Sequence, residues 1–351
     1  MKAGDEIPPP ARFRFQSQDC VPSVPSCGTF AVIASRAPTR EGVLRAAEKV
    51  SAILPPTPLL PVTIHGVTLR VKCESLQPIG AFKIRGAWHR LTELSEEERT
   101  RGIVAVSSGN HAQGVAWAAQ RLGIEATIVM PRNAPQVKLD ATRALGAEIF
   151  LYERPGEDRD EVAARLIAEK GGTLVHAFAD PWVIEGQGSA GIEAEAQLGH
   201  TPSRFIACCG GGGLAAGLAL ACPRAAIHVV EPLGWDMVGQ ALAAGSVVRA
   251  AANAPSTICD ALQPDATKPI NLSVLHGRAE PGVSVTDDEV RAAQAFAFSQ
   301  LRLVLEPGGA AGLAAALAGK VPLDADTVIM LTGGNVDPAQ FASVVGAIGC
   351  N

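Results

Sequence analysis

Short apolar segments alternate with amphipathic segments along the chain from residue 39 onward. In residues 39–50 the apolar side chains recur at helical spacing behind Thr39, a residue type that caps helix N-termini, so this segment predicts a helix. The short apolar segments are rich in β-branched residues and predict buried strands. Strands are expected at residues 67–73, 102–106, 126–130, 147–152, 173–176, 205–209, 226–230 and 327–331. Further helices are expected at residues 83–94, 111–122, 135–145, 158–170, 188–198, 214–221, 287–300 and 310–318.

This alternation predicts an α/β fold with mostly parallel sheets that carry helices on both faces. In such sheets ligands bind at the carboxyl ends of the strands, so the residues that follow each strand are the first candidates for chemistry. Residues 1–40 differ from the rest, because they hold a run of prolines at positions 8–10 and little periodicity. They predict a poorly ordered N-terminal extension.

Composition narrows the class of protein. The chain has 351 residues, 47% of them hydrophobic and 19% charged, which is typical of a globular protein of about two domains. Its net charge of -5 and the lack of a lysine or arginine run argue against a nucleic-acid partner or an anionic membrane surface. The longest apolar stretches, such as residues 214–222, fall short of the roughly 20 residues that a membrane span requires.

The eight cysteines form no Cys-x-x-Cys pair and no spacing that suits a zinc site, and they are too sparse for a disulfide scaffold. Cys208 and Cys209 lie in an apolar run, where buried and inert thiols are expected. The N-terminal residues lack the basic region and apolar stretch of a secretory signal. We therefore predict a cytoplasmic protein in a reducing compartment.

A glycine loop follows the strand expected at residues 205–209 and precedes a helix. It consists of Gly210, Gly211, Gly212 and Gly213. Bare backbone N–H groups at a helix N-terminus bind phosphate, so the loop indicates a phosphate site. Two alternatives remain open on spacing alone: a purely structural turn, and a degenerate dinucleotide-binding motif that ends at Ala215 with Glu231 as the ribose ligand.

A second candidate is the segment Ser107-Ser108-Gly109-Asn110-His111, which follows a strand and begins a helix. Its hydroxyl, amide and backbone N–H groups are typical of a carboxylate site, but they are also typical of an ordinary helix cap.

A third candidate is Lys83, which lies among small and apolar residues between Gly80 and Ala87. Desolvation lowers the pKa of a lysine in such surroundings and makes it a nucleophile, whereas the alternative is a surface lysine at a helix start.

Together these segments resemble the serine/threonine dehydratase and serine racemase group of fold-type II enzymes, which depend on pyridoxal phosphate (PLP). The resemblance covers residues 39–346 and rests on the motifs SLQPIGAFKIRGA (75–87), SSGNHAQG (107–114), GGGG (210–213), EPGGA (306–310) and LTGGNVD (331–337). It implies a tryptophan synthase β-like fold of two three-layer α/β domains. The large PLP-binding domain would comprise residues 41–98 plus 179–351, and the small domain residues 99–178, with the active site in the cleft.

The resemblance also implies roles for cofactor-binding residues. Lys83 would form the internal aldimine with PLP and later remove the Cα proton, and Phe82 would pack near the ring. Asn110 would bond the 3-hydroxyl of the cofactor, and the glycine loop with the N–H of Leu214 would hold its phosphate. Thr332 would meet the pyridine nitrogen.

For the substrate, Ser107, Asn110 and His111 would supply donors to the carboxylate, and Ser108 would face Lys83 across the substrate as a second acid or base. Because the hydroxyl of Thr332 is neutral, it does not hold a proton on the ring nitrogen, which favours prompt loss of a β-leaving group. The resemblance therefore implies β-elimination of a serine, threonine or 3-hydroxyaspartate type amino acid to a 2-keto acid and ammonia.

Alternatives of the same fold are an amino-acid racemase and a β-replacement synthase, and a non-catalytic amino-acid-binding protein is a further class. A homodimer is the expectation for the group. Many relatives bind a divalent cation through an acid at the position of Glu231 and another acid six residues on. That second position is Met237 here, with Asp236 one place early, so we predict no metal ligands.

Overall fold

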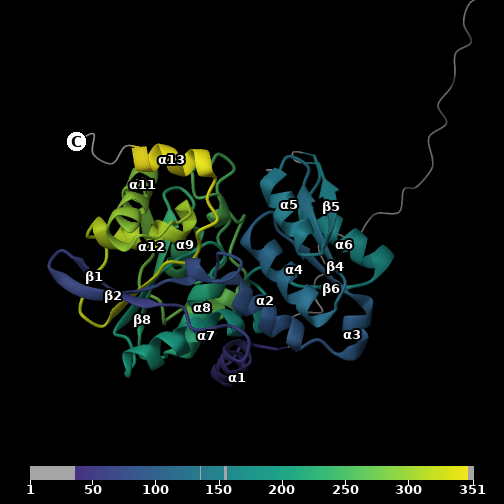
Figure 1. Ribbon diagram of the computed structural model, residues 1–351, viewed down its shortest axis with the longest axis horizontal. Coiled ribbons are helices and arrows are strands. Elements are labelled where there is room, and N and C mark those ends of the chain that lie inside the picture. Colours follow the sequence, from purple (N-terminus) through teal and green to yellow (C-terminus); the bar gives the residue numbers. More distant parts are fainter. Residues whose placement is uncertain (1–35, 135, 154–155, 347–351) are drawn as a thin grey trace, which may run out of the picture.

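The computed structural model of the chain describes residues 36–134, 136–153 and 156–346, which form two β-sheets flanked by helices (Figure 1). The larger sheet has six strands in the order β1-β2-β10-β7-β8-β9, and the smaller sheet has four in the order β5-β4-β3-β6. The neighbouring strands pair in parallel except for β1 and β2, which form an antiparallel hairpin. This confirms the predicted α/β class with mostly parallel sheets.

The strands of the larger sheet are β1 (Leu59–Ile64), β2 (Val67–Lys72), β7 (Arg204–Cys208), β8 (Ala226–Pro232), β9 (Val283–Val285) and β10 (Thr327–Met330). Those of the smaller sheet are β3 (Ile103–Val106), β4 (Ala126–Pro131), β5 (Glu148–Tyr152) and β6 (Thr173–Leu174). The α-helices are α1 (Arg40–Ser51), α2 (Lys83–Thr92), α3 (Glu96–Arg101), α4 (Asn110–Leu122), α5 (Gln136–Ala144), α6 (Arg159–Lys170), α7 (Pro181–Leu198), α8 (Gly213–Ala221), α9 (Met237–Ala244), α10 (Pro269–Leu275), α11 (Asp287–Phe296), α12 (Pro307–Leu317) and α13 (Pro338–Gly346).

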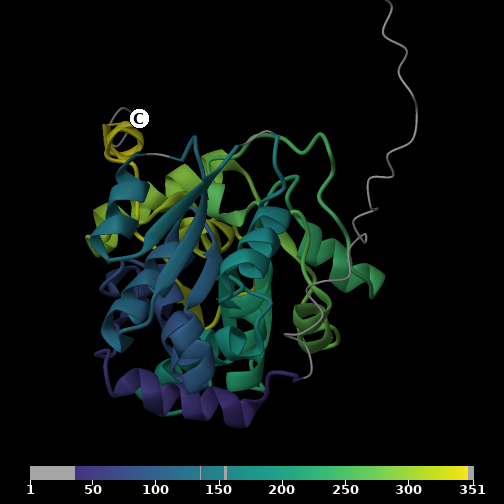
Figure 2. The ribbon, with the colours of Figure 1, turned by 90° about the vertical axis from the view of Figure 1, so that its right-hand side faces the viewer.

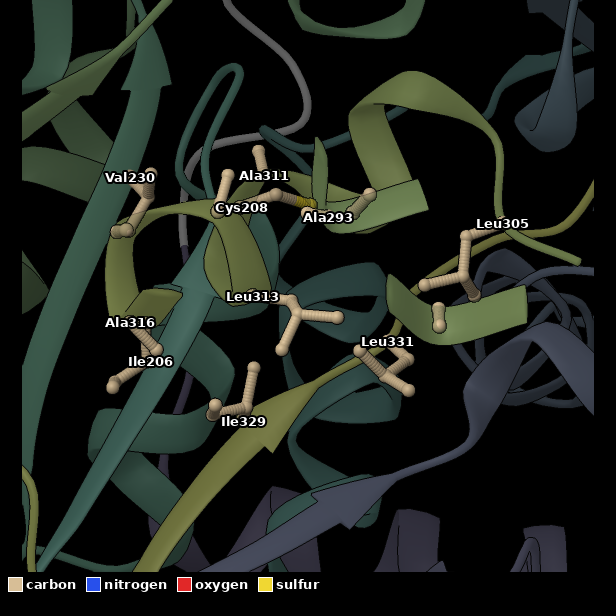
Figure 3. Packing of buried hydrophobic residues seen from close by; sticks show 14 of the residues in the cluster. Ile206, Cys208, Val230, Ala293, Leu305, Ala311, Leu313, Ala316, Ile329 and Leu331 are labelled. Atoms are coloured by element: carbon tan, nitrogen blue, oxygen red, sulfur yellow. The ribbon is translucent and has the colours of Figure 1, made fainter. Parts of the chain in front are cut away.

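The larger sheet is buried on both faces. Alternate residues of β7 enter different hydrophobic clusters: Ile206 packs in one cluster with Leu313 of α12, and Phe205 packs in the other with Leu218 of α8. Figure 3 shows the first of these clusters, with Ile206 and Leu313 among its labelled side chains. Because both faces of the sheet are buried, successive residues of β7 are apolar, which explains the continuous hydrophobic run in this part of the sequence.

The smaller sheet is also covered on both faces, with Ile128 in a cluster with Val115 of α4 and Val129 in a cluster with Leu166 of α6. In Figure 1 its strands and helices α4 to α6 lie on the right, beside the larger sheet. All four strands fall between residues 103 and 174, which is consistent with the predicted small domain at residues 99–178. The domain boundaries themselves stay a prediction.

Helix α1 begins as predicted, because Thr39 is its N-cap and accepts the N–H of Gly42. It runs along the base of the molecule in Figure 2. The predicted N-terminal extension lies outside the described residues except for residues 36–40. Within the described ranges, no helix has both the length and the apolar character that crossing a membrane would need.

Several predicted boundaries are wrong. Helix α7 begins at Pro181 and not at residue 188, since Asp180 accepts the N–H groups of Trp182 and Val183 and proline suits the first helical position. The helix expected at residues 287–300 leaves the α-helical form after Phe296 and continues as one π-helical turn, Ala297–Leu301. Strand β1 has no counterpart in the prediction.

Candidate active site

Lys83 is the first residue of α2 and is half-buried. Its Nζ donates to the carbonyl oxygen of Ala177 at 2.8 Å and lies 5.0 Å from the ring centre of Phe82. Burial lowers the pKa of Lys83 from the ordinary 10.5 to about 8, although Cys208 and Glu306 nearby oppose this change. The amine is therefore deprotonated far more readily than that of a surface lysine.

A buried ionic network holds α2 in place behind Lys83. Arg85 is buried and forms two parallel hydrogen bonds with Glu74, each 2.7 Å long, and a third bond of 2.9 Å to Glu193 of α7. Lys72 of β2 donates to the same Glu193. Because a paired arginine fork fixes direction as well as distance, this network orients the helix that carries Lys83.

The glycine loop lies between β7 and α8, next to Phe178. Gly212 has a φ of +92° and is the N-cap of α8, and a Cβ at Gly211 would lie 2.2 Å from the ring of Phe178. A helix leaves its first N–H groups without partners inside the helix, and no side chain among the described residues caps α8. These groups, including those of Gly213 and Leu214, suit an anion.

The predicted carboxylate site is the segment from β3 to α4. Ser107 donates its backbone N–H to Val129 at 3.2 Å, and its hydroxyl oxygen accepts the N–H of Gly109 at 3.2 Å. Ser108 is half-buried at the same helix start. Gly109 is the N-cap of α4, and no side chain among the described residues caps this helix. Its first-turn N–H groups therefore stay available to a carboxylate.

His111 is buried, and its imidazole is hydrogen-bonded to the backbone. Its Nε2 lies 2.9 Å from the carbonyl oxygen of Val175 and must donate to it, since a carbonyl only accepts. Burial, with Lys83 nearby, lowers the pKa of His111 to about 3, so Nδ1 carries no hydrogen, and it has no partner among the described residues. The donor available to a substrate at this position is the backbone N–H.

Thr332 follows β10 and contacts Phe82, the residue before Lys83. Its carbonyl oxygen accepts the N–H of Phe82 at 3.0 Å, which joins the two segments directly. Its hydroxyl oxygen is 3.1 Å from the sulfur of Cys208, the last residue of β7. Cys208 is buried as predicted, but it contacts a predicted site residue and is not an isolated thiol.

Asn110 joins two residues that have no predicted role, Glu306 and Asn335. Its Nδ2 donates to Oε1 of Glu306 at 2.6 Å, and its Oδ1 accepts Nδ2 of Asn335 at 2.8 Å. Burial raises the pKa of Glu306 to about 7, in spite of the hydrogen bond from Asn110. Both partners lie in motifs that the resemblance quotes, so their positions could have been found from sequence although their contacts could not.

Glu231 at the end of β8 accepts hydrogen bonds from a helix start. Its two oxygens accept the N–H groups of Val238 at 2.9 Å and Gly239 at 2.8 Å, at the start of α9. In the part of the chain that the structure describes, no three or more His, Cys, Asp or Glu side chains are grouped to hold a metal ion. The carboxylate is used to cap a helix.

Comparisons with known proteins identify the family of this chain and the relatives that it resembles. A family model described as pyridoxal-phosphate dependent enzyme matches residues 50–333. The chain is 36% identical over 317 residues to the L-threo-3-hydroxyaspartate ammonia-lyase of Saccharomyces cerevisiae, which covers 88% of this chain and 96% of that protein. It is 34% identical over 314 residues to the serine racemase of Schizosaccharomyces pombe, with 87% and 96% covered. The solved structure of maize serine racemase superposes with a TM-score of 0.82 at 33% identity, covering 88% of this chain and 97% of that one.

Proposed function

The chain belongs to the family of pyridoxal-phosphate dependent enzymes, and from this we propose that it catalyses β-elimination of a β-hydroxy amino acid of the serine, threonine or 3-hydroxyaspartate type. The products are a 2-keto acid and ammonia. One observation carries the proposal: Lys83, whose amine has a lowered pKa, directly follows Phe82, whose N–H donates to Thr332, in a chain similar over most of its length to an ammonia-lyase.

The chemistry of the donor set fits PLP. The amine of Lys83 suits the aldehyde, the N–H groups at the start of α8 suit the phosphate, and the hydroxyl of Thr332 suits the pyridine nitrogen. Phe82 and Asn110 complete the proposed cofactor site. When bound, PLP supplies an electron sink that stabilises negative charge at the substrate Cα.

The chain's own residues then divide the work of binding and proton transfer. Ser107 and the N–H groups of Asn110 and His111 bind and orient the substrate carboxylate. Lys83 takes the proton from Cα, a role that its pKa of about 8 permits near neutral pH. Thr332 offers a neutral hydroxyl, which does not hold a proton on the ring nitrogen and so favours prompt departure of the β-hydroxyl.

A second candidate function is racemisation, which similarity to a serine racemase supports. Inverting Cα requires an acid or base on each side of the substrate. Ser108 is our candidate opposite Lys83, because it lies at the helix start that would bind the substrate carboxylate.

The test is keto-acid release by PLP-loaded protein with both enantiomers of serine and threonine, the 3-hydroxyaspartate isomers and phenylserine. Elimination predicts keto acid from one preferred member of this panel, and loss of that activity in Lys83→Ala. A yellow protein that releases no keto acid but interconverts enantiomers supports racemisation, and one that consumes an added thiol or indole supports β-replacement. A colourless protein that takes up no PLP overturns the proposal.

We propose further that the enzyme is a homodimer in the cytoplasm. Membership of the group supports the dimer. Five described cysteines, Cys73, Cys208, Cys209, Cys222 and Cys259, are free and buried, which supports a reducing compartment. Analytical ultracentrifugation and cell fractionation test these two statements.

A further inference from the structure

Cys208 and Thr332 meet where two neighbouring strands end. β7 and β10 pair in parallel, with Ile206 opposite Ile329, so the segments that leave their carboxyl ends stay side by side. The sulfur of Cys208 is 3.1 Å from the hydroxyl oxygen of Thr332, and both residues are buried, with 7% and 2% of their surfaces exposed. Figure 3 shows Cys208 among the apolar side chains of the cluster to which α11 and α12 contribute.

The hydrogen bond can run in either direction. A threonine hydroxyl has one hydrogen to donate and two lone pairs that accept, and a thiol is a weak donor and a weak acceptor. Burial raises the pKa of Cys208 to about 11, so its sulfur carries a hydrogen at neutral pH. If Thr332 donates to the sulfur, its only hydrogen is used. If Cys208 donates to Thr332, that hydrogen stays free for another acceptor.

We propose that Cys208 is a positioning residue, whose S–H donates to Thr332 and leaves the threonine hydroxyl free to donate to the pyridine nitrogen of PLP. The inference rests on the proposed function, which supplies the contact between Thr332 and that nitrogen. Accepting a hydrogen bond also makes a hydroxyl a better donor, so the thiol strengthens the bond that Thr332 makes.

The other described cysteines support a special role for Cys208. The sulfur atoms of Cys73, Cys209 and Cys222 lie 3.7 to 3.8 Å from backbone carbonyl oxygens, and the thiol of the fourth, Cys259, bonds the side chain of Thr257, which has no role in the proposed site. Of the five described cysteines, Cys208 is the one whose sulfur contacts a side chain of the proposed site. It is also close enough to Lys83 to alter the pKa of the amine.

The experiment compares PLP-loaded Cys208→Ala, Cys208→Ser and Cys222→Ala with the unmodified protein. The readouts are the visible absorption band of the bound PLP and its dissociation constant. Cys208→Ala should shift the band and weaken PLP binding about threefold to tenfold, the range for one hydrogen bond. Cys208→Ser keeps a donor and should retain both properties, and Cys222→Ala is a matched control for the loss of a buried thiol.

A role in packing alone gives a different result, in which Cys208→Ala behaves like Cys222→Ala, with lower heat stability and an unchanged band. That result overturns the inference. The variant Thr332→Ala distinguishes a failure of this inference from a failure of the proposed function. If Thr332→Ala leaves the band unchanged, the assumed contact of Thr332 with PLP is wrong, and the inference falls with it.

If Thr332→Ala shifts the band, adding Cys208→Ala to that variant should cause no further shift, because the thiol acts through the hydroxyl. A shift in Thr332→Ala without one in Cys208→Ala overturns the role of Cys208 and leaves the proposed function standing.

Discussion

Glu306 is a buried acid with a raised pKa that contacts a residue of the proposed site. Its carboxyl group is buried at the N-cap of α12 and bonds the amide of Asn110. A Cβ at Gly333 would lie 2.0 Å from Oε1 of Glu306, so glycine is required where this carboxyl group packs. Burial raises its pKa from the ordinary 4.5 to about 7, which means that the folded protein favours the neutral acid.

Replacing Glu306 with Gln should therefore stabilise the protein at pH 8 and change little below pH 4.5. Between pH 4.5 and 7 the native state binds the proton more tightly than the unfolded state, so stability falls as pH rises through this window. Gln avoids this cost, which is on the order of 1–3 kcal/mol at pH 8. Melting temperatures of the variant and the unmodified protein at pH 4.5 and pH 8 measure the effect.

Glu289 supplies the control, because its pKa shift has the opposite sign. It is partly buried, but Lys320 and the N–H of Thr286 favour the charged form, and its pKa is lowered. Glu289→Gln should therefore destabilise the protein at pH 8. If both variants change the melting temperature at pH 8 in the same direction, the argument for Glu306 is wrong.

Single residues were predictable where their type and local context carry the chemistry. A lysine among small side chains, or an amide and hydroxyls at a helix start, can be recognised in a short window, which is why the sequence alone suggests roles for Lys83 and Asn110. The partners Cys208, Glu306 and Asn335 were not assigned roles. Each acts through a contact that exists only after strands and helices from distant parts of the chain come together.

At the scale of elements, α7 and α8 pack so closely that backbone meets backbone. A Cβ at Gly217 of α8 would lie 2.5 Å from the backbone of Gly188 and of Ile184 in α7. The same helix α8 presents the N–H groups proposed for the phosphate. Close packing through glycine therefore sets where that helix N-terminus lies.

Gly217→Ala should lower the free energy of unfolding by about 1–3 kcal/mol and weaken PLP binding. The cost of forcing two backbones apart exceeds the gain of about 1 kcal/mol in helix propensity from alanine. Denaturant unfolding and PLP titration measure the two effects. Gly346→Ala is the control, since no described residue beyond its chain neighbours and its own helix lies within 4 Å of a Cβ there. Equal stability of the two variants would contradict the packing argument.

Helices and strands were predictable where hydrophobic periodicity is strong, and missed where tertiary contacts override it. The first part of α7 contains Gly186 and Gly188, which lower helix propensity, yet α7 forms because its glycines allow neighbouring backbones to approach. Strand β1 contains Pro61, which argues against a strand in the interior of a sheet. It is tolerated because β1 is the edge strand.

At the scale of the whole molecule, polar contacts join the two sheets across the proposed site. Asn110 at the start of α4 bonds Glu306, the N-cap of α12, and Asn335, which follows β10 of the larger sheet. Lys138 of α5 donates to Asp260 at 2.7 Å in the same way. These contacts connect the side of the molecule that holds the predicted carboxylate site to the side that holds Lys83. Their strength should therefore influence substrate binding.

The ion pair of Lys138 and Asp260 offers the clearest test of whether these contacts influence substrate binding. Both side chains reach solvent, with 27% and 62% of their surfaces exposed, so they can be replaced without disturbing a hydrophobic core. Lys138→Glu places two like charges together and should raise the KM of the preferred substrate about twofold to fivefold, the range for an exposed pair. The reversed pair, Lys138→Asp with Asp260→Lys, should restore KM.

Lys170→Glu is the control, since its partner Glu148 lies on the same side of the site. An unchanged KM in Lys138→Glu, or no recovery in the reversed pair, would mean that this contact does not hold the two sides together during substrate binding.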